Sequence, residues 1–268
     1  SFTLGAVVQP VRELSFTIDY YNIKKTDVIT GAPLSAQALN AYYAGEELPE
    51  GYSVVLNPAD PAFPTGIRTV ATVVGPYANA SSLKTSGIDF SALAEFRLAE
   101  NVRFSSQIEA SRILKFSFVP AEGEEAQEYV GTQGPYILSS GAGTPKWRGN
   151  WSNSLEVGPT TLTATAYYVS GYKNIAEDIS GAGAREDCAA AGDLYDPEMC
   201  YTDDFITIDL VGSYEVNENF TFYANVLNLF DAKAPLNAPN YAANNYNPTW
   251  SQQGAVGRFF RIGANVKF

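Results

Sequence analysis

A hydrophobic period of two residues runs through most of this chain and restricts its fold more than any other feature. It is plainest at the end of the sequence, in residues 256–268. One face of that segment is entirely apolar and consists of Phe260, Ile262, Ala264, Val266 and Phe268. The other face carries Phe259, Arg261, Gly263, Asn265 and Lys267. Such alternation is that of a β-strand, and an apolar face opposite a polar one predicts a strand with lipid on one side and water on the other.

The same alternation recurs along the chain and predicts about nine strands. Its segments are residues 2–8, 14–29, 68–98, 102–111, 145–157, 161–172, 206–214, 220–229 and 257–268. The alternation is strict only from Gly87 onward in the third segment, which leaves the strand count open between residues 68 and 86.

The connections between these segments alternate in length. Short turns are expected at residues 10–13, 99–101, 158–160 and 216–219, and long loops at 30–67, 117–143, 174–203 and 231–255. Short turns on one rim and long loops on the other are typical of an outer-membrane β-barrel. The alternative, a soluble β-sandwich, need not segregate its loops and would carry more Lys and Glu on its outer face. In the first long loop, residues 35–43 are predicted to form a short helix with Ser35 as N-cap and Gly45 near its end.

Composition excludes several functions. The formal net charge of −12 argues against nucleic-acid binding, which needs a basic face. The chain has no histidine, so Ser-His catalysis and His-zinc sites are not available within it. It has no nucleophile elbow of the G-x-S-x-G type and no phosphate-binding glycine loop. We therefore predict no catalytic residue, no resident metal and no cofactor.

Two cysteines, Cys188 and Cys200, lie in one of the long loops. A single pair in a loop-rich and exported chain predicts a disulfide; two free thiols are the alternative. The surrounding carboxylates are Glu186, Asp187, Asp193, Asp196, Glu198, Asp203 and Asp204. Their spacing matches no calcium loop, so a solvated acidic loop is the preferred interpretation.

Strand parity carries an expectation about the whole protein. A single-chain bacterial barrel has an even number of strands, with both chain ends on the short-turn side. Nine is odd, so residues 1–268 are expected to be the C-terminal portion of a larger barrel whose earlier part precedes Ser1. The terminal strand is expected to pair with residues 220–229 on one side and with a strand outside this chain on the other.

Four segments resemble a known family. They are LSFTIDYYNIKKTDVI at 14–29, YANASSLKTSGIDFSA at 77–92, YANVLNLFDAKAP at 223–235 and GRFFRIGANVKF at 257–268. Together, in this order, they resemble the closing half of TonB-dependent outer-membrane receptors. The resemblance implies about nine strands of a 22-stranded barrel filled by an N-terminal plug, and Phe268 as the terminal aromatic read by the barrel-assembly machinery. A plug and a TonB box are not found in these 268 residues.

The function implied is uptake, across a Gram-negative outer membrane, of a ligand of the siderophore, carbohydrate or cobalamin class. The implied partners are outer-membrane lipid, the N-terminal plug, the remaining barrel strands, a TonB-type energy-coupling complex acting through the plug, the assembly machinery and a small-molecule ligand. The long loops would be extracellular and the C-terminus would lie at the periplasmic rim. A passive porin or a small structural barrel is the alternative.

Ligand contacts are expected in the long loops and the upper lumen wall, because strands provide a rigid frame and loops vary. The candidates are the loop aromatics Tyr129, Tyr136, Tyr241, Tyr246 and Trp250. Alternatively, these rings pack the loops together or lie in the interfacial aromatic girdle. The charged residues predicted to face the lumen are Glu95, Arg97, Arg103, Glu109, Arg148, Glu156 and Arg261. We expect them to form ion-pair ladders with one another or to contact a plug.

Overall fold

A computed structural model describes the chain except for residues 121–122, 140, 175, 177–199, 238–244 and 268. Its centre is one antiparallel sheet in the order β1-β2-β5-β6-β8-β9-β12-β13-β14. These nine strands confirm the predicted number. Their bounds are Phe2–Val11, Leu14–Gly31, Tyr77–Ala99, Val102–Val119, Trp147–Val157, Thr160–Val169, Phe205–Asn217, Phe220–Leu227 and Phe259–Val266. In the described part of the chain, β1 and β14 are the two edge strands.

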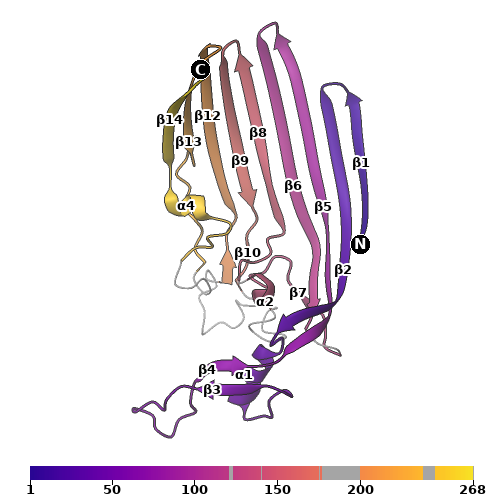
Figure 1. Cartoon of the computed structure of the whole chain (residues 1–268), viewed down its shortest axis with the longest axis vertical. Coiled ribbons are helices and arrows are strands. Elements are labelled where there is room, and N and C mark those ends of the chain that lie inside the picture. Colours follow the sequence, from indigo (N-terminus) through magenta and orange to yellow (C-terminus); the bar gives the residue numbers. More distant parts are fainter. Residues whose placement is uncertain (121–122, 140, 175, 177–199, 238–244, 268) are drawn as a thin grey trace.

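Turn length segregates between the two ends of the sheet, as predicted. The short turns gather at one end, and the long connections gather at the other with all the small helices and strands (Figure 1). We call these ends the short-turn rim and the long-loop rim. The first turn is tighter than predicted, because β1 continues through Pro10 to Val11 and only Arg12 and Glu13 remain between the strands. Proline is tolerated there because Pro10 lies within a register shift of the β1–β2 ladder, between Val8 and Val11, where regular pairing is interrupted.

The structure resolves the irregular segment 68–86. Residues Val70–Val74 form β4, which pairs with β3 (Ser53–Leu56) in a separate two-stranded sheet beyond the long-loop rim. β5 then runs without interruption from Tyr77 to Ala99. The segment therefore adds no strand to the main sheet.

The predicted helix in the first loop is present as α1, Ser35–Ala44. Its N-cap is Leu34, not Ser35, and no side chain caps that end. The Ser35 hydroxyl instead donates to the Ala32 carbonyl oxygen at 2.5 Å, so it stabilises the preceding turn. Gly45 ends the helix with φ 72°, a left-handed conformation that favours glycine.

The two faces of the sheet differ as the alternation predicted. Large apolar side chains such as Ile18, Trp151 and Ile262 are exposed on the outward face. On the other, lumen-side face, serine, threonine and charged residues lie opposite one another from strand to strand. Two tyrosine rings of the lumen face, Tyr21 and Tyr223, lie over the glycines directly opposite them, Gly87 and Gly263. A side chain on either glycine would collide with the tyrosine ring.

A β-bulge changes the phase of β6 near the long-loop rim. Gly87 of β5 lies opposite Ile113, whereas the adjacent Ser86 lies opposite Lys115, so Leu114 is the extra residue. Before the bulge the even-numbered residues of β6 face outward, and beyond it the odd-numbered residues do. This shift turns Phe118 inward, where it is buried against Tyr129 and Ala176.

The remaining elements are short and lie at the long-loop rim. They are β7 (Gln127–Glu128), α2 (Tyr136–Ser139), β10 (Tyr172–Lys173), β11 (Tyr201–Thr202) and α4 (Gln252–Val256). None of the described helices is long and apolar enough to cross a membrane. β14 pairs with β13 from Phe220↔Val266 to Leu227↔Phe259, which confirms the predicted partner of the terminal strand. Phe268 lies outside the described residues.

Candidate functional site

Three long connections meet in a buried polar cluster at the long-loop rim. The side-chain amide nitrogen of Asn237 lies 2.9 Å from Gln133 Oε1, from the Tyr172 hydroxyl and from Thr202 Oγ1. Asn247 reaches the same Tyr172 hydroxyl at 2.6 Å. All five side chains are buried, and they come from the connections β6–β8, β9–β12 and β13–β14. We call these five residues the buried polar cluster.

Backbone hydrogen bonds also join the loops that form the buried polar cluster. Gln133 N donates to the Lys173 carbonyl oxygen at 2.8 Å, and Lys173 N donates to the Gly131 carbonyl oxygen at 2.9 Å. Asn174 N donates to the Cys200 carbonyl oxygen at 2.9 Å beside the β10–β11 pair. The described parts of these three loops are therefore joined to one another, and we call them the loop layer.

The last loop is also fixed to the sheet. The buried Asn228 has φ 50° and accepts a hydrogen bond from Ala232 N at 2.8 Å. Asp231 accepts from Lys233 Nζ at 2.8 Å and from Arg258 N at 2.9 Å, and the ammonium group of Lys233 holds the pKa of that carboxyl below its ordinary value. These contacts place α4 and Trp250 beside the start of β14.

The predicted ligand-contact aromatics divide into different environments. Tyr129 is completely buried against Phe118 and Ala176, which agrees with the packing alternative for this ring. Tyr136 begins α2 and is half-buried, as is Tyr246. Tyr241 lies outside the described residues.

Trp250 lies in the connection between β13 and β14 and contacts two other parts of the long-loop rim. Its indole nitrogen donates to the Ala142 carbonyl oxygen at 2.5 Å, which ties it to the β6–β8 connection. The guanidinium carbon of Arg148, on the lumen face of β8, lies 6.0 Å from the centre of the Trp250 ring. A cation and an aromatic ring thus lie together at the long-loop rim. The two residues are 102 positions apart, so no local sequence pattern predicts that they meet.

The predicted ion-pair ladders are not found among the described residues: no ion pair joins two of the seven lumen-facing charges. These residues instead make hydrogen bonds and a cation–π contact. Glu109 accepts hydrogen bonds from Gln107 at 2.9 Å and Asn150 at 3.4 Å. Arg97 donates to the Glu100 carbonyl oxygen at 2.8 Å. Arg261 lies over the ring of Tyr223 at 5.8 Å.

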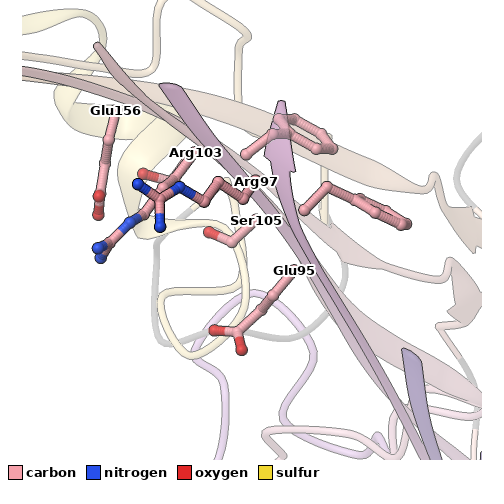
Figure 2. A pocket seen from close by; sticks show the side chains of 8 residues that line it. Glu95, Arg97, Arg103, Ser105 and Glu156 are labelled. Atoms are coloured by element: carbon pink, nitrogen blue, oxygen red, sulfur yellow. The ribbon is translucent and has the colours of Figure 1, made fainter. Parts of the chain in front are cut away.

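A cavity of about 300 Å³ opens on the lumen face near the short-turn rim (Figure 2). Arg97 of β5 lies directly opposite Arg103 of β6, and Arg103 lies opposite Glu156 of β8. Glu95 and Ser105 complete the labelled lining, and the Glu95 carboxylate points away from the two arginines (Figure 2). Two arginines and two carboxylates therefore line the same cavity.

The acidic loop is only partly described. Asp204 accepts hydrogen bonds from the Tyr168 hydroxyl at 2.9 Å and from Gly171 N at 2.6 Å, so this carboxylate has a structural role. The carboxylates between 186 and 198 lie outside the described residues. In the part of the chain that the structure covers, no group of three or more acidic or cysteine side chains is arranged to hold a metal ion.

The disulfide between Cys188 and Cys200 stays a prediction. Cys200 is buried, with 1% of its surface exposed, but Cys188 lies outside the described residues. Because a single cysteine pair in a loop of an exported chain indicates an oxidising compartment, we expect the two sulfurs to be linked. Non-reducing peptide mass spectrometry of exported protein should find the peptide around 188 joined to the peptide around 200. Alkylation of both thiols without prior reduction would refute the link.

Nine antiparallel strands, each with an apolar and a polar face, short turns at one rim and long connections at the other are typical of a segment of an outer-membrane β-barrel. Residues 1–229 match the family described as "TonB dependent receptor-like, beta-barrel". The chain belongs to this family, whose members are transporters of the Gram-negative outer membrane and not enzymes.

Solved structures show the same fold. The siderophore receptor PirA from Acinetobacter baumannii is 13% identical with a TM-score of 0.55, covering 99% of this chain and 31% of that one. A variant of the ferric enterobactin receptor PfeA from Pseudomonas aeruginosa is 14% identical with a TM-score of 0.53, covering 99% and 30%. For the outer membrane transporter YddB from Escherichia coli the values are 16%, 0.53, 99% and 32%. This chain thus spans about a third of the length of these receptors. Comparison with curated protein sequences finds no match.

Proposed function

We propose that residues 1–268 are the C-terminal portion of the barrel of a receptor that imports a scarce or large ligand with energy from a TonB-type complex. The long-loop rim is extracellular and the C-terminus lies at the periplasmic rim. The ligand belongs to the siderophore, carbohydrate or cobalamin class. The names of PfeA and PirA, a ferric enterobactin receptor and a siderophore receptor, favour the first of these classes.

The proposal assigns partners to the parts of the chain. Further barrel strands pair with the free edges of β1 and β14. A plug domain contacts the charged lumen wall of Figure 2 and transmits the action of the energy-coupling complex. Phe268 is the residue that the barrel-assembly machinery reads.

The proposed binding role rests on one observation, the contact between Arg148 and Trp250 at the long-loop rim. An indole face stacks on sugars, on aromatic rings and on flat chelates, and a neighbouring guanidinium attracts their carboxylate or phenolate oxygens. Because the buried polar cluster joins the loops before a ligand arrives, ligand binding needs little further ordering of these loops. Tyr136, Tyr241 and Tyr246 are proposed as further contacts, whereas Tyr129 contributes by packing the loops.

Removing either member of this pair is expected to weaken ligand binding about tenfold. Trp250→Ala and Arg148→Gln would be made in the full-length receptor. Dissociation constants would be measured by calorimetry against a panel of ferric siderophores, oligosaccharides and cobalamin.

A matched pair on the opposite face provides the control. Arg112 lies 5.2 Å from the ring centre of Trp147, and both residues face outward. Arg112→Gln and Trp147→Ala should leave ligand affinity unchanged. Equal losses in both pairs would contradict the assignment of the site. Uptake that continues after the proton-motive force is collapsed would favour the passive porin.

A further inference from the structure

Four cations gather on the outward face of the sheet, where its apolar band ends toward the long-loop rim. They are Lys24 of β2, Lys84 of β5, and Arg112 and Lys115 of β6. All four are exposed. This grouping is unexpected in a chain with only 17 basic residues against 29 acidic ones.

Strand register places these cations on one surface. Lys24 lies directly opposite Lys84, and one row nearer the apolar band Ser86 lies opposite Lys115. One row further, Ile88 lies opposite Arg112, which in turn lies opposite Trp147. The bulge in β6 is what brings Lys115 to the same face as Arg112, although three positions separate them.

The rows below the cations are apolar. Ile18 lies opposite Phe90, and Phe90 lies opposite Ala110. The four cations therefore stand at the boundary between a surface that contacts hydrocarbon and the layer above it. Trp147 is a ring of the kind that lies at this boundary in membrane proteins.

The positive charge of the cluster is poorly compensated within the chain. Of the four cations only Lys115 forms an ion pair among the described residues, with Glu128 at 3.1 Å. Two like charges placed directly opposite in a sheet repel each other, so the Lys24 and Lys84 pair is destabilising unless an anion lies between the two ammonium groups. The surroundings offer one abundant source of anions at this height, the headgroups of the membrane lipid.

We propose that Lys24, Lys84, Arg112 and Lys115 bind the phosphates of a lipid headgroup in the leaflet at the long-loop rim. The lysines supply point charges and the arginine a planar donor, both suited to phosphate oxygens. The acyl chains of the same lipid lie along the apolar rows of β2, β5 and β6. This binding is independent of which solute the receptor transports.

The test uses the full-length receptor and purified lipid A, a phosphorylated lipid. Removing both opposed lysines, Lys24→Gln with Lys84→Gln, is expected to weaken lipid A binding about 30-fold, since each basic residue near the surface contributes a few-fold to tenfold. Native mass spectrometry of detergent-purified protein titrated with lipid A would give the affinity. Dephosphorylated lipid A should bind the unmodified receptor at least as weakly as lipid A binds the double variant, which keeps Arg112 and Lys115.

A double variant with the same loss of charge is the control. Lys25 is next to Lys24 but points to the opposite face, and Lys267 lies at the short-turn rim beyond β14. Lys25→Gln with Lys267→Gln should keep lipid A affinity within about twofold. The proposal is overturned if this control loses as much affinity as the test variant, if the test variant binds as wild type does, or if removing the phosphates leaves binding unchanged.

Discussion

Replacing Ile262 with arginine is expected to lower the free energy of unfolding from a bilayer by about 2–4 kcal/mol. Ile262 lies near the middle of β14 and is 84% exposed on the outward face. Its neighbour across the ladder is Ala224, which offers no polar partner to a guanidinium. The charge would therefore remain in hydrocarbon or pull the strand toward the rim. The change is measured by a urea titration of receptor refolded into phosphatidylcholine vesicles.

Asn265→Arg is the matched change on the other face of the same strand. Asn265 lies opposite Thr221 on the lumen side, where an added guanidinium is in contact with water. Its cost should be no more than about 1 kcal/mol. If the two arginines cost the same, the assignment of the lipid and lumen faces of β14 is wrong.

Asn237→Leu is expected to destabilise the loop layer by about 2–3 kcal/mol while leaving the strands intact. Asn237 is fully buried, and its amide nitrogen donates a hydrogen bond to Gln133 Oε1. A buried acceptor that loses its donor costs about 1–3 kcal/mol, and the Tyr172 and Thr202 hydroxyls lose one contact each. Amide hydrogen exchange at 131–133 and 172–174 should accelerate about a hundredfold, because local opening becomes easier by that energy.

Asn245→Leu is the control for this loop. Asn245 is exposed, and its contact with Asn237 is through the backbone, where its carbonyl oxygen accepts from Asn237 N at 3.0 Å. Exchange at the same amides should stay as in the unmodified receptor. Comparable acceleration in both variants would mean that the loop layer responds to any apolar substitution. No acceleration in either variant would mean that the buried polar cluster does not stabilise the loop layer.

The strands were predictable because their signal is local. Each strand shows its two faces in its own residues, and the terminal segment also indicated its partner, β13. The departures from prediction are equally local: Pro10 lies in β1, at a register shift of the ladder, and the Ser35 hydroxyl stabilises the preceding turn instead of capping the helix. Neither departure changes the sheet.

The loop layer was not predictable for the opposite reason. Gln133 and Asn237 meet across 104 positions, and nothing beside either residue indicates a buried partner. The same holds for Arg148 and Trp250. A loop tyrosine such as Tyr129 fits a ligand contact and a packing role equally well, and only its burial against Phe118 separates the two.

The single extra residue in β6 changes which positions of the strand face outward. On either side of Leu114 the strand keeps its alternation, but the parity of the outward positions is reversed. Alternation counted through β6 without the bulge would therefore assign Lys115 and Phe118 to the wrong faces. Before Leu114 an even position such as Ile108 faces outward, and beyond it an even position such as Phe118 faces the protein's own interior.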